Sequence, residues 1–250
     1  MKMRTKVSIA VILSISFLFL MNSCQSEDSG EKTAEERDTV NVLVDEAIAP
    51  MMQEPFRMYR EDKPEVELIT ETVDAWEAMR QLLSGNTDVV VLARDYLKTE
   101  DSLMKEFDVK KHVRSRFAQD ALVFFVQKNF PLDTLNTEIV KKLLTEKDTE
   151  LKDLLPQLEK EPEFVINDNY SSEFANLLML AADYQPIVKP MKKFSTPDSV
   201  IEYVRANSNA VGIGLLSQVV NDGFFKSLRI GYIDTSGVYV RASKPVHQAY

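Results

Sequence analysis

From residue 40 onward, short apolar runs alternate with longer amphipathic stretches. Strands are predicted at residues 40–44, 66–70 and 88–93, with helices at 50–61 and 74–84 between them. The last of these strands, DVVVLA, is a nearly continuous β-branched run, which is typical of a buried parallel strand. The order strand, helix, strand, helix, strand predicts a parallel sheet with crossover helices.

A second unit of the same kind is expected after residue 120. Its strands are predicted at residues 121–127, 164–166, 210–214, 228–233 and 238–241, and its helices at 136–145, 173–183 and 196–207. Because no glycine-rich linker separates the two units, we expect them to share a hinge. The predicted fold class is therefore α/β, with two lobes of parallel-rich sheets: lobe I over residues 40–120 and lobe II over residues 121–235.

The first residues have the layout of a secretory signal peptide, assigned to residues 1–23. Three basic residues precede an apolar run from Val7 to Met21, which is shorter than the roughly 20 residues of a membrane-spanning helix. Cys24, the only cysteine, follows directly. Its position resembles the lipobox of bacterial lipoproteins, in which this cysteine is acylated. The alternative is an ordinary secreted protein with an unused thiol.

Residues 24–39 are rich in charged residues and contain no aromatic residue. Such a segment buries little apolar surface and is expected to form a disordered acidic tether. The chain is therefore expected in the cell envelope, anchored to a membrane by lipid, and either periplasmic or surface-exposed. A formal net charge of −9 argues against nucleic acid as a partner.

The sequence contains no recognisable catalytic or metal-binding motif. There is no phosphate-cradling GxxxxGK[ST], no GxSxG, no HExxH and no EF-hand loop. The two histidines, His112 and His247, have no partner at ligand spacing, and a single cysteine cannot build a metal cluster. We expect no enzyme activity, no metal and no cofactor.

The segment Asp168–Ser172 offers a binding site of another kind. It lies between a predicted strand and a predicted helix, where free backbone N–H groups and two hydroxyls favour an oxyanion. The alternative is that Ser171 only caps its helix.

Five segments resemble, in order, those of the phosphate-binding proteins of ABC transporters. They are LARDYLKTED (92–101), FAQDALVFFVQKN (117–129), LNTEIVKKLLTEK (135–147), DNYSSEFANLL (168–178) and VIEYVRANSNAVGIG (200–214). The resemblance implies a type II periplasmic-binding fold, in which two lobes close on an oxyanion and an ABC permease receives it. It also implies ligand-binding positions at Asp45, Glu46, Ala47, Arg94, Asp95, Ser171 and Ser172.

The chain departs from the family pattern at the site and at its end. Ala47 and Ile48 stand where the family has Thr or Ser, and the serine loop lacks the family's arginine and glycine. Residues 236–250 are expected to form an incomplete return segment, which predicts an uncovered apolar face in lobe I. The departures leave two functions open: a lipoprotein that binds phosphate or another small oxyanion for transport, or a non-transport sensor or interaction lipoprotein with a degenerate pocket.

Overall fold

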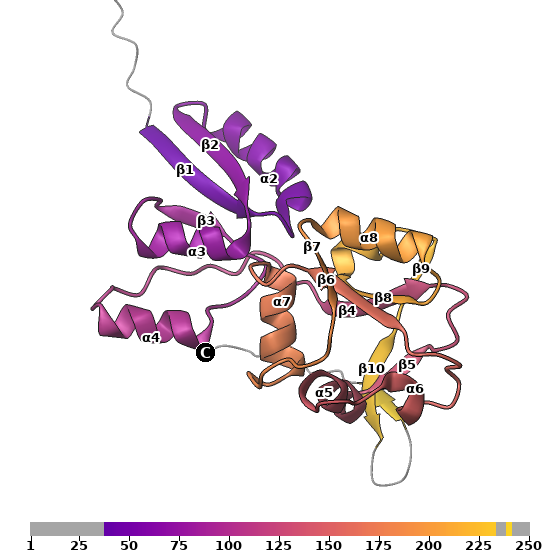
Figure 1. Ribbon diagram of the computed structural model, residues 1–250. Coiled ribbons are helices and arrows are strands. Elements are labelled where there is room, and N and C mark those ends of the chain that lie inside the picture. The colour runs from indigo at the N-terminus through magenta and orange to yellow at the C-terminus, as the bar shows by residue number, and fades with distance from the viewer. Residues whose placement is uncertain (1–37, 234–238, 242–250) are drawn as a thin grey trace, which may run out of the picture. The chain divides into compact units, whose positions relative to one another are not determined.

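The computed structural model describes residues 38–233 and 239–241. Its strands form three sheets, two of which carry the main core (Figure 1). The predicted signal peptide and Cys24 lie outside the described residues, as do most of the tether and most of the return segment.

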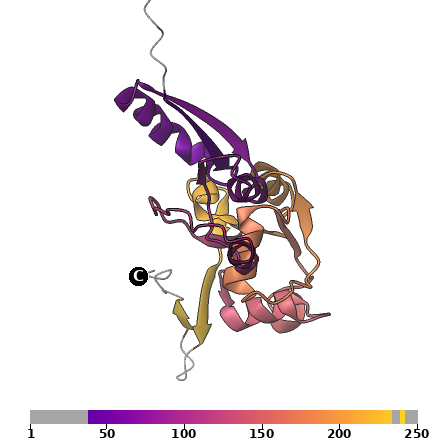
Figure 2. The same ribbon diagram turned by 90° about the vertical axis from the view of Figure 1, so that its left-hand side faces the viewer.

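The first sheet is parallel and has the strand order β2-β1-β3. Strand β1 (Asp38–Asp45) is central and pairs with β2 (Val66–Val73) over its whole length and with β3 (Val89–Val91) near its end. Helices α2 (Ala49–Asp62) and α3 (Ala75–Leu83) make the two crossovers. Both ribbon views show α2 running alongside β1 and β2 (Figure 2). This order confirms the predicted alternation of strands and helices.

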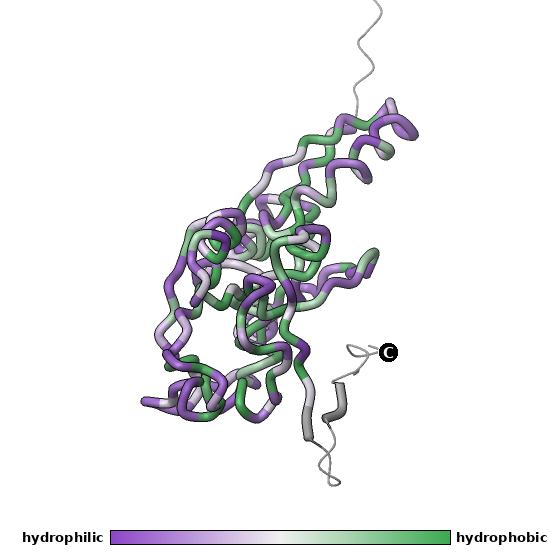
Figure 3. Tube along the Cα trace, turned by 90° about the vertical axis from the view of Figure 1, so that its right-hand side faces the viewer, coloured by the Kyte–Doolittle hydropathy of each residue, from purple (hydrophilic) through white to green (hydrophobic). Residues whose placement is uncertain are grey.

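The ends of these helices follow from local sequence signals. Pro50 stands at the start of α2, where its missing N–H costs no hydrogen bond. Asp74 caps α3, and its Oδ1 accepts the Glu77 N–H at 2.7 Å. Gly85 ends α3 with a φ of +69°, a conformation that L residues rarely adopt. Along α2, where Figure 3 shows both hydrophobic and hydrophilic residues, the buried Met52 and the half-buried Phe56 are four positions apart and so share the covered face of the helix.

Strand β3 differs from its sequence prediction. The run at residues 88–93 was expected to form a buried strand, but only Val89–Val91 is extended, at the edge of the sheet, and Val89 is 38% exposed. A β-branched run favours a strand but does not determine how many neighbours that strand has.

The second sheet has five strands in the order β7-β6-β8-β4-β9. Strands β6 (Glu163–Asn167) and β7 (Lys192–Phe194) run parallel to each other, and β6 is also parallel to β8 (Ala210–Leu215). Strand β4 (Leu122–Gln127) is antiparallel to both β8 and β9 (Phe225–Ser227). The sheet is therefore mixed, and helix α8 (Pro197–Ala206), capped by Thr196, packs against β6 and β8.

Both faces of this sheet are covered. Phe124 and Val126 of β4 belong to one buried cluster with Ile213, whereas Val123 and Phe125 belong to a second cluster. Alternate residues of one strand point to opposite faces. All six residues of β8 are buried, so this strand lies at the centre of the core.

A third, small sheet has the order β11-β10-β5, built from β5 (Thr134–Asn136), β10 (Arg229–Ile233) and β11 (Tyr239–Arg241). Helix α5 (Thr137–Thr145) follows β5 and is capped by Asn136, as predicted. The remaining helices are α4 (Lys98–Glu106), α6 (Leu151–Leu154), α7 (Ser172–Asn176) and α9 (Leu216–Val219). The helix predicted at 173–183 is instead α7 followed by a π-helical segment, η1 (Leu177–Ala181).

Among the strands that the structure describes, none of the first sheet pairs with a strand of the other two. The lobe boundaries at residues 120 and 235 stay predictions. None of the helices in the described part of the chain is long and apolar enough to cross a membrane.

Candidate functional site

The candidate site is centred on Asp45, the last residue of β1. Its side chain is completely buried, and both carboxylate oxygens accept hydrogen bonds. Oδ1 accepts the Ala47 N–H at 3.0 Å, and Oδ2 accepts the Ala93 N–H at 3.1 Å. Oδ2 also accepts the hydroxyl of Ser172. Two backbone amides and one hydroxyl therefore converge on one carboxylate.

These three donors come from three separate places in the chain. Ala47 lies in the turn between β1 and α2, where the Ile48 N–H donates to the Asp45 carbonyl at 3.0 Å. Ala93 follows β3, so the ends of two neighbouring parallel strands meet here. Ser172 is the first residue of α7. We call this group the Asp45 junction. It comprises Asp45, Ala47, Ala93 and Ser172 and the residues that join them through the hydrogen bonds described next, namely Glu46, Asn167, Glu173, Asn176 and Gln218.

Further hydrogen bonds join the same elements. The Asn167 amide donates to Glu46 Oε1 at 2.7 Å, and the Asn176 amide donates to the Ala93 carbonyl at 2.9 Å. Gln218 Nε2 donates to the Ala47 carbonyl at 3.2 Å and to Glu173 Oε1 at 2.9 Å. The junction is therefore closed by direct hydrogen bonds within the chain.

An apolar contact lies beside these bonds. Ala47, Ile48 and Leu215 are buried together, with the half-buried Val91 and Ala93 against them. Ile48 is thus part of the packing between the end of β1 and β8 and is 7% exposed.

The junction is acidic. Burial raises the pKa of Asp45, although the Ser172 hydroxyl, the two amides and the charge of Arg94 oppose this rise. Burial also raises the pKa of Glu46, and the nearby charges of Asp45, Asp168 and Asp74 add to the effect.

Glu173 is a further buried carboxyl group of the junction. It is 1% exposed, its Oε2 has no hydrogen-bond partner among the described residues, and burial raises its pKa to about 7. A buried carboxylate with one unsatisfied oxygen is costly, so the protonated form is favoured there.

Some of the predicted site residues lie at the Asp45 junction, and others have different roles. Ser172 lies at the junction, but the Ser171 hydroxyl donates to the Asp168 carbonyl at 2.9 Å and accepts the Phe174 N–H at 3.1 Å. Ser171 therefore caps α7, which is the alternative role that the sequence left open. Glu46 and Ala47 lie at the junction, through a side chain and through backbone groups respectively.

Arg94 and Asp95 bond to other groups. The Arg94 guanidinium is 2% exposed and makes a two-pronged pair with Glu100, with Nη1–Oε2 at 2.8 Å and Nη2–Oε1 at 2.6 Å. Asp95 is exposed and pairs with Arg114 at 2.6 Å. Arg94 acts on Asp45 only through its charge.

Sequence reasoning missed Asn167, Glu173, Asn176 and Gln218 as junction residues. Nothing in the local sequence separates these four from ordinary polar residues. Their partners lie far away in the chain; Gln218 and Ala47 are 171 positions apart.

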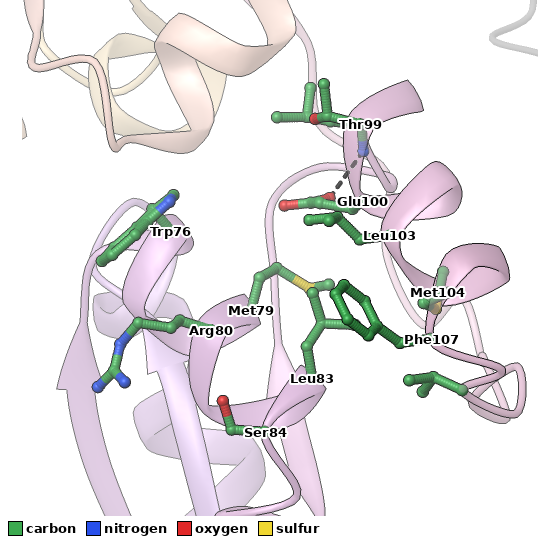
Figure 4. Close-up of a pocket in the computed structure, with 12 residues that line it drawn as sticks. Trp76, Met79, Arg80, Leu83, Ser84, Thr99, Glu100, Leu103, Met104 and Phe107 are labelled. Atoms are coloured by element: carbon green, nitrogen blue, oxygen red, sulfur yellow. Dashed lines mark hydrogen bonds between the residues drawn. The ribbon is translucent and has the colours of Figure 1, made fainter.

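A separate apolar pocket of about 370 Å³ lies between α3 and α4. Figure 4 shows Met79, Leu83 and Phe107 pointing into the same space, with Trp76 and Thr99 at its rim. The pocket shares no lining residue with the Asp45 junction, and its carboxylate, Glu100, is already bonded to Arg94.

The described residues contain no group of three or more His, Cys, Asp and Glu that could hold a metal ion. The ring of His112 instead bonds through Nδ1 to the Tyr96 hydroxyl at 2.9 Å. His247 lies outside the described residues.

Residues 29–244 match the family model of the PBP superfamily domain. No curated protein matches the chain in sequence. Among solved structures, the chain is similar to a phosphate ABC transporter substrate-binding protein with bound phosphate from Clostridium perfringens, with a TM-score of 0.61, 18% identity, and coverage of 77% of this chain and 76% of that one.

It is also similar to an ABC-type phosphate transport receptor from Vibrio cholerae, with a TM-score of 0.57, 17% identity, and coverage of 77% and 76%. A third similar structure is the CcmR regulatory domain from Synechocystis in complex with 2-PG, with a TM-score of 0.53, 9% identity, and coverage of 78% and 81%. At these identities the likeness concerns the fold, which is the type II periplasmic-binding fold.

Proposed function

Because the chain belongs to the PBP superfamily, we propose that it is an extracytoplasmic solute-binding lipoprotein that captures phosphate or another small oxyanion. One observation carries this proposal: two backbone amides and a serine hydroxyl converge on the buried carboxylate of Asp45. A carboxylate is itself an oxyanion, and the donors that hold it suit the oxygens of a free one. Two of the similar structures are a phosphate ABC transporter substrate-binding protein with bound phosphate and an ABC-type phosphate transport receptor, which supports the ligand class.

In the proposed function, each group of the site has its own role. The Ala47 and Ala93 amides are fixed donors, because the strands before them hold their backbone. Ser172 adds a hydroxyl from α7, so binding unites residues that are 127 positions apart. An ABC permease is the proposed recipient of the solute.

The lipid anchor is the second part of the proposal and rests on Cys24 behind the predicted signal peptide. In cells, the Cys24→Ser variant is expected to move from the membrane fraction to the soluble envelope fraction, as measured by fractionation and immunoblotting. Retention of this variant in the membrane fraction would contradict acylation of Cys24.

A non-transport sensor or interaction lipoprotein is the second candidate. The observation that favours it is the closed junction, in which Asn167, Asn176 and Gln218 donate hydrogen bonds directly to residues that follow β1 and β3. In this second candidate, the protein keeps the fold of a solute-binding protein, and the Asp45 carboxylate permanently occupies the place of the solute.

A thermal-shift titration of the mature protein separates the two candidates. Phosphate, sulfate, a phosphonate and formate are added at constant ionic strength to the wild type and to Ser172→Ala. Binding to the folded state raises the melting temperature by mass action. A saturable rise in the wild type that Ser172→Ala loses supports oxyanion capture, whereas no rise at millimolar concentration supports the second candidate.

A further inference from the structure

Asp45 holds the position that a captured oxyanion needs. We infer that Asp45 is an internal ligand, whose carboxylate occupies the oxyanion site and competes with a solute for the amides of Ala47 and Ala93 and the hydroxyl of Ser172. This inference rests on the proposed function and deepens it, because it names the residue that sets the affinity and the class of anion that fits.

The hydrogen bonds of the Asp45 carboxylate resemble those of a bound oxyanion. Each carboxylate oxygen has a donor: Oδ1 takes the Ala47 N–H, and Oδ2 takes the Ala93 N–H and the Ser172 hydroxyl. The side chain is fully buried, and its three donors are neutral because they are two backbone amides and a hydroxyl, while the nearby Arg94 is bonded to Glu100. The donors thus form a cradle for one planar monoanion with two oxygens.

Asp120 offers a matched comparison in the same chain. It also accepts two amides and a serine hydroxyl, from Ala121 at 2.7 Å, from Ser217 N–H at 3.2 Å and from Ser217 Oγ. However, Asp120 is only partly buried, and its donors come from its own neighbour and from the first turn of α9. A free anion there gains little over water, whereas at Asp45 the donors are shielded from water.

The surroundings limit the charge that the site accepts. Glu46 and Glu173 lie close enough to affect each other electrostatically, and Glu173 Oε2 has no partner. A second negative charge on the anion is repelled by whichever of these carboxyl groups is ionised, and more strongly above pH 7, where Glu173 has lost its proton. We therefore expect short monocarboxylates, such as formate and acetate, to fit better than the phosphate dianion once Asp45 is removed.

The test is chemical rescue of the mature Asp45→Ala protein. Its melting temperature is measured with increasing formate, acetate and phosphate, with sodium chloride holding the ionic strength constant. We expect a lower melting temperature than that of the wild type, and a saturable recovery with formate or acetate. The affinity of the variant for formate should exceed that of the wild type at least tenfold.

Asp120→Ala is the control. It removes a carboxylate with the same set of donors, and it should show no saturable recovery with any of the three anions. If Asp45→Ala does not recover either, or if its affinity equals that of the wild type, Asp45 is an ordinary structural residue and the inference fails.

Asp45→Asn keeps the test decisive if Asp45→Ala does not fold. Asn retains the shape of the side chain, but its amide nitrogen cannot accept a hydrogen bond, so the internal ligand binds its donors more weakly. An oxyanion should bind this variant more tightly than the wild type, and equal affinities would overturn the inference. Binding to the variants without binding to the wild type would instead support the internal ligand and contradict the transport role.

Discussion

The five-stranded sheet and the β2-β1-β3 sheet are stabilised in different ways. Clusters of buried aliphatic and aromatic residues cover both faces of the five-stranded sheet. The core of the first sheet is smaller: it consists of Val42, Val44 and Met52 with a few half-buried neighbours, and of the buried face of α3. Polar bonds take a larger part there, above all the buried pair of Arg94 and Glu100 and the bonds of Asp45. The part of the chain that supplies most of the site is thus the part with the smaller apolar core.

Exposed apolar side chains occur in both regions. Trp76 is 50% exposed and Phe107 69%, whereas Leu180 and Val220, after residue 121, are each 59% exposed. The uncovered apolar face that the sequence predicts in lobe I therefore stays a prediction.

The largest effect is expected from breaking the buried ion pair. Arg94→Ala leaves the carboxylate of Glu100 buried without its partner, which should cost about 3–5 kcal/mol of unfolding free energy. The exposed Arg80, paired with Glu77, is the control, and Arg80→Ala should cost less than about 1 kcal/mol. Urea denaturation measures both; similar losses would mean that the first sheet does not depend on its buried pair.

The next effect compares a buried residue of the five-stranded sheet with an exposed residue of the first sheet. Ile213→Ala in β8, where the residue is 1% exposed, should cost about 2–5 kcal/mol. Ile69→Ala in β2, where the residue is 47% exposed, should cost less than about 1 kcal/mol. Denaturation in urea gives both values, and a loss at Ile69 equal to that at Ile213 would contradict the contrast between the sheets.

Glu173 predicts a pH dependence. Burial raises its pKa from 4.5 to about 7, so the folded state binds a proton that the unfolded state has released in this range. The contribution of Glu173 to stability is therefore highest below pH 4.5 and falls as the pH rises to about 7. At 1.36 kcal/mol per unit, the loss is at most about 3 kcal/mol.

Glu173→Gln removes this titration and keeps an oxygen for Gln218. The variant should be more stable than the wild type at pH 8 and should lose less stability between pH 5 and pH 8. Melting curves across this range measure the effect. A wild type and a variant with parallel pH profiles would show that Glu173 is ionised in the folded protein.

The smallest effects are expected at the helix caps, which are alike in both regions. Asp74→Ala and Asn136→Ala each remove an acceptor for a backbone N–H, at 2.7 Å in both cases, and should each cost about 0.5–2 kcal/mol. Circular dichroism melts test this expectation. If one substitution reduced stability far more than the other, the difference between the two sheets would extend to their helix caps.

Local signals in the sequence predicted much of the fold. The caps at Asp74, Asn136, Ser171 and Thr196 and the turn at Gly85 act within four residues, so the sequence around each one contains the relevant chemistry. The buried run at residues 121–127 predicted a strand, but its composition does not distinguish parallel from antiparallel pairing, and β4 is antiparallel to both of its neighbours.

The site could be predicted only in part. The loop of Asp168–Ser172 pointed to both serines, yet only Ser172 reaches Asp45, because Ser171 is used as the cap. Which hydroxyl faces Asp45 depends on the packing of α7 against residues 127 positions earlier. Arg94 pairs with Glu100, six positions later, a contact that the sequence did not predict, and its expected role in binding a solute stays a prediction.

The central claim is that an oxyanion binds to the donors now held by Asp45, and amide NMR tests it most directly. The ¹⁵N–¹H signals of Ala47 and Ala93 are followed while phosphate or formate is added to the mature wild type, with Ser172→Ala as the control. We predict that both signals shift saturably in the wild type, and that the shifts are weakened in the variant. Signals that stay unchanged at millimolar anion would contradict the claim and leave Asp45 as the permanent occupant of the site.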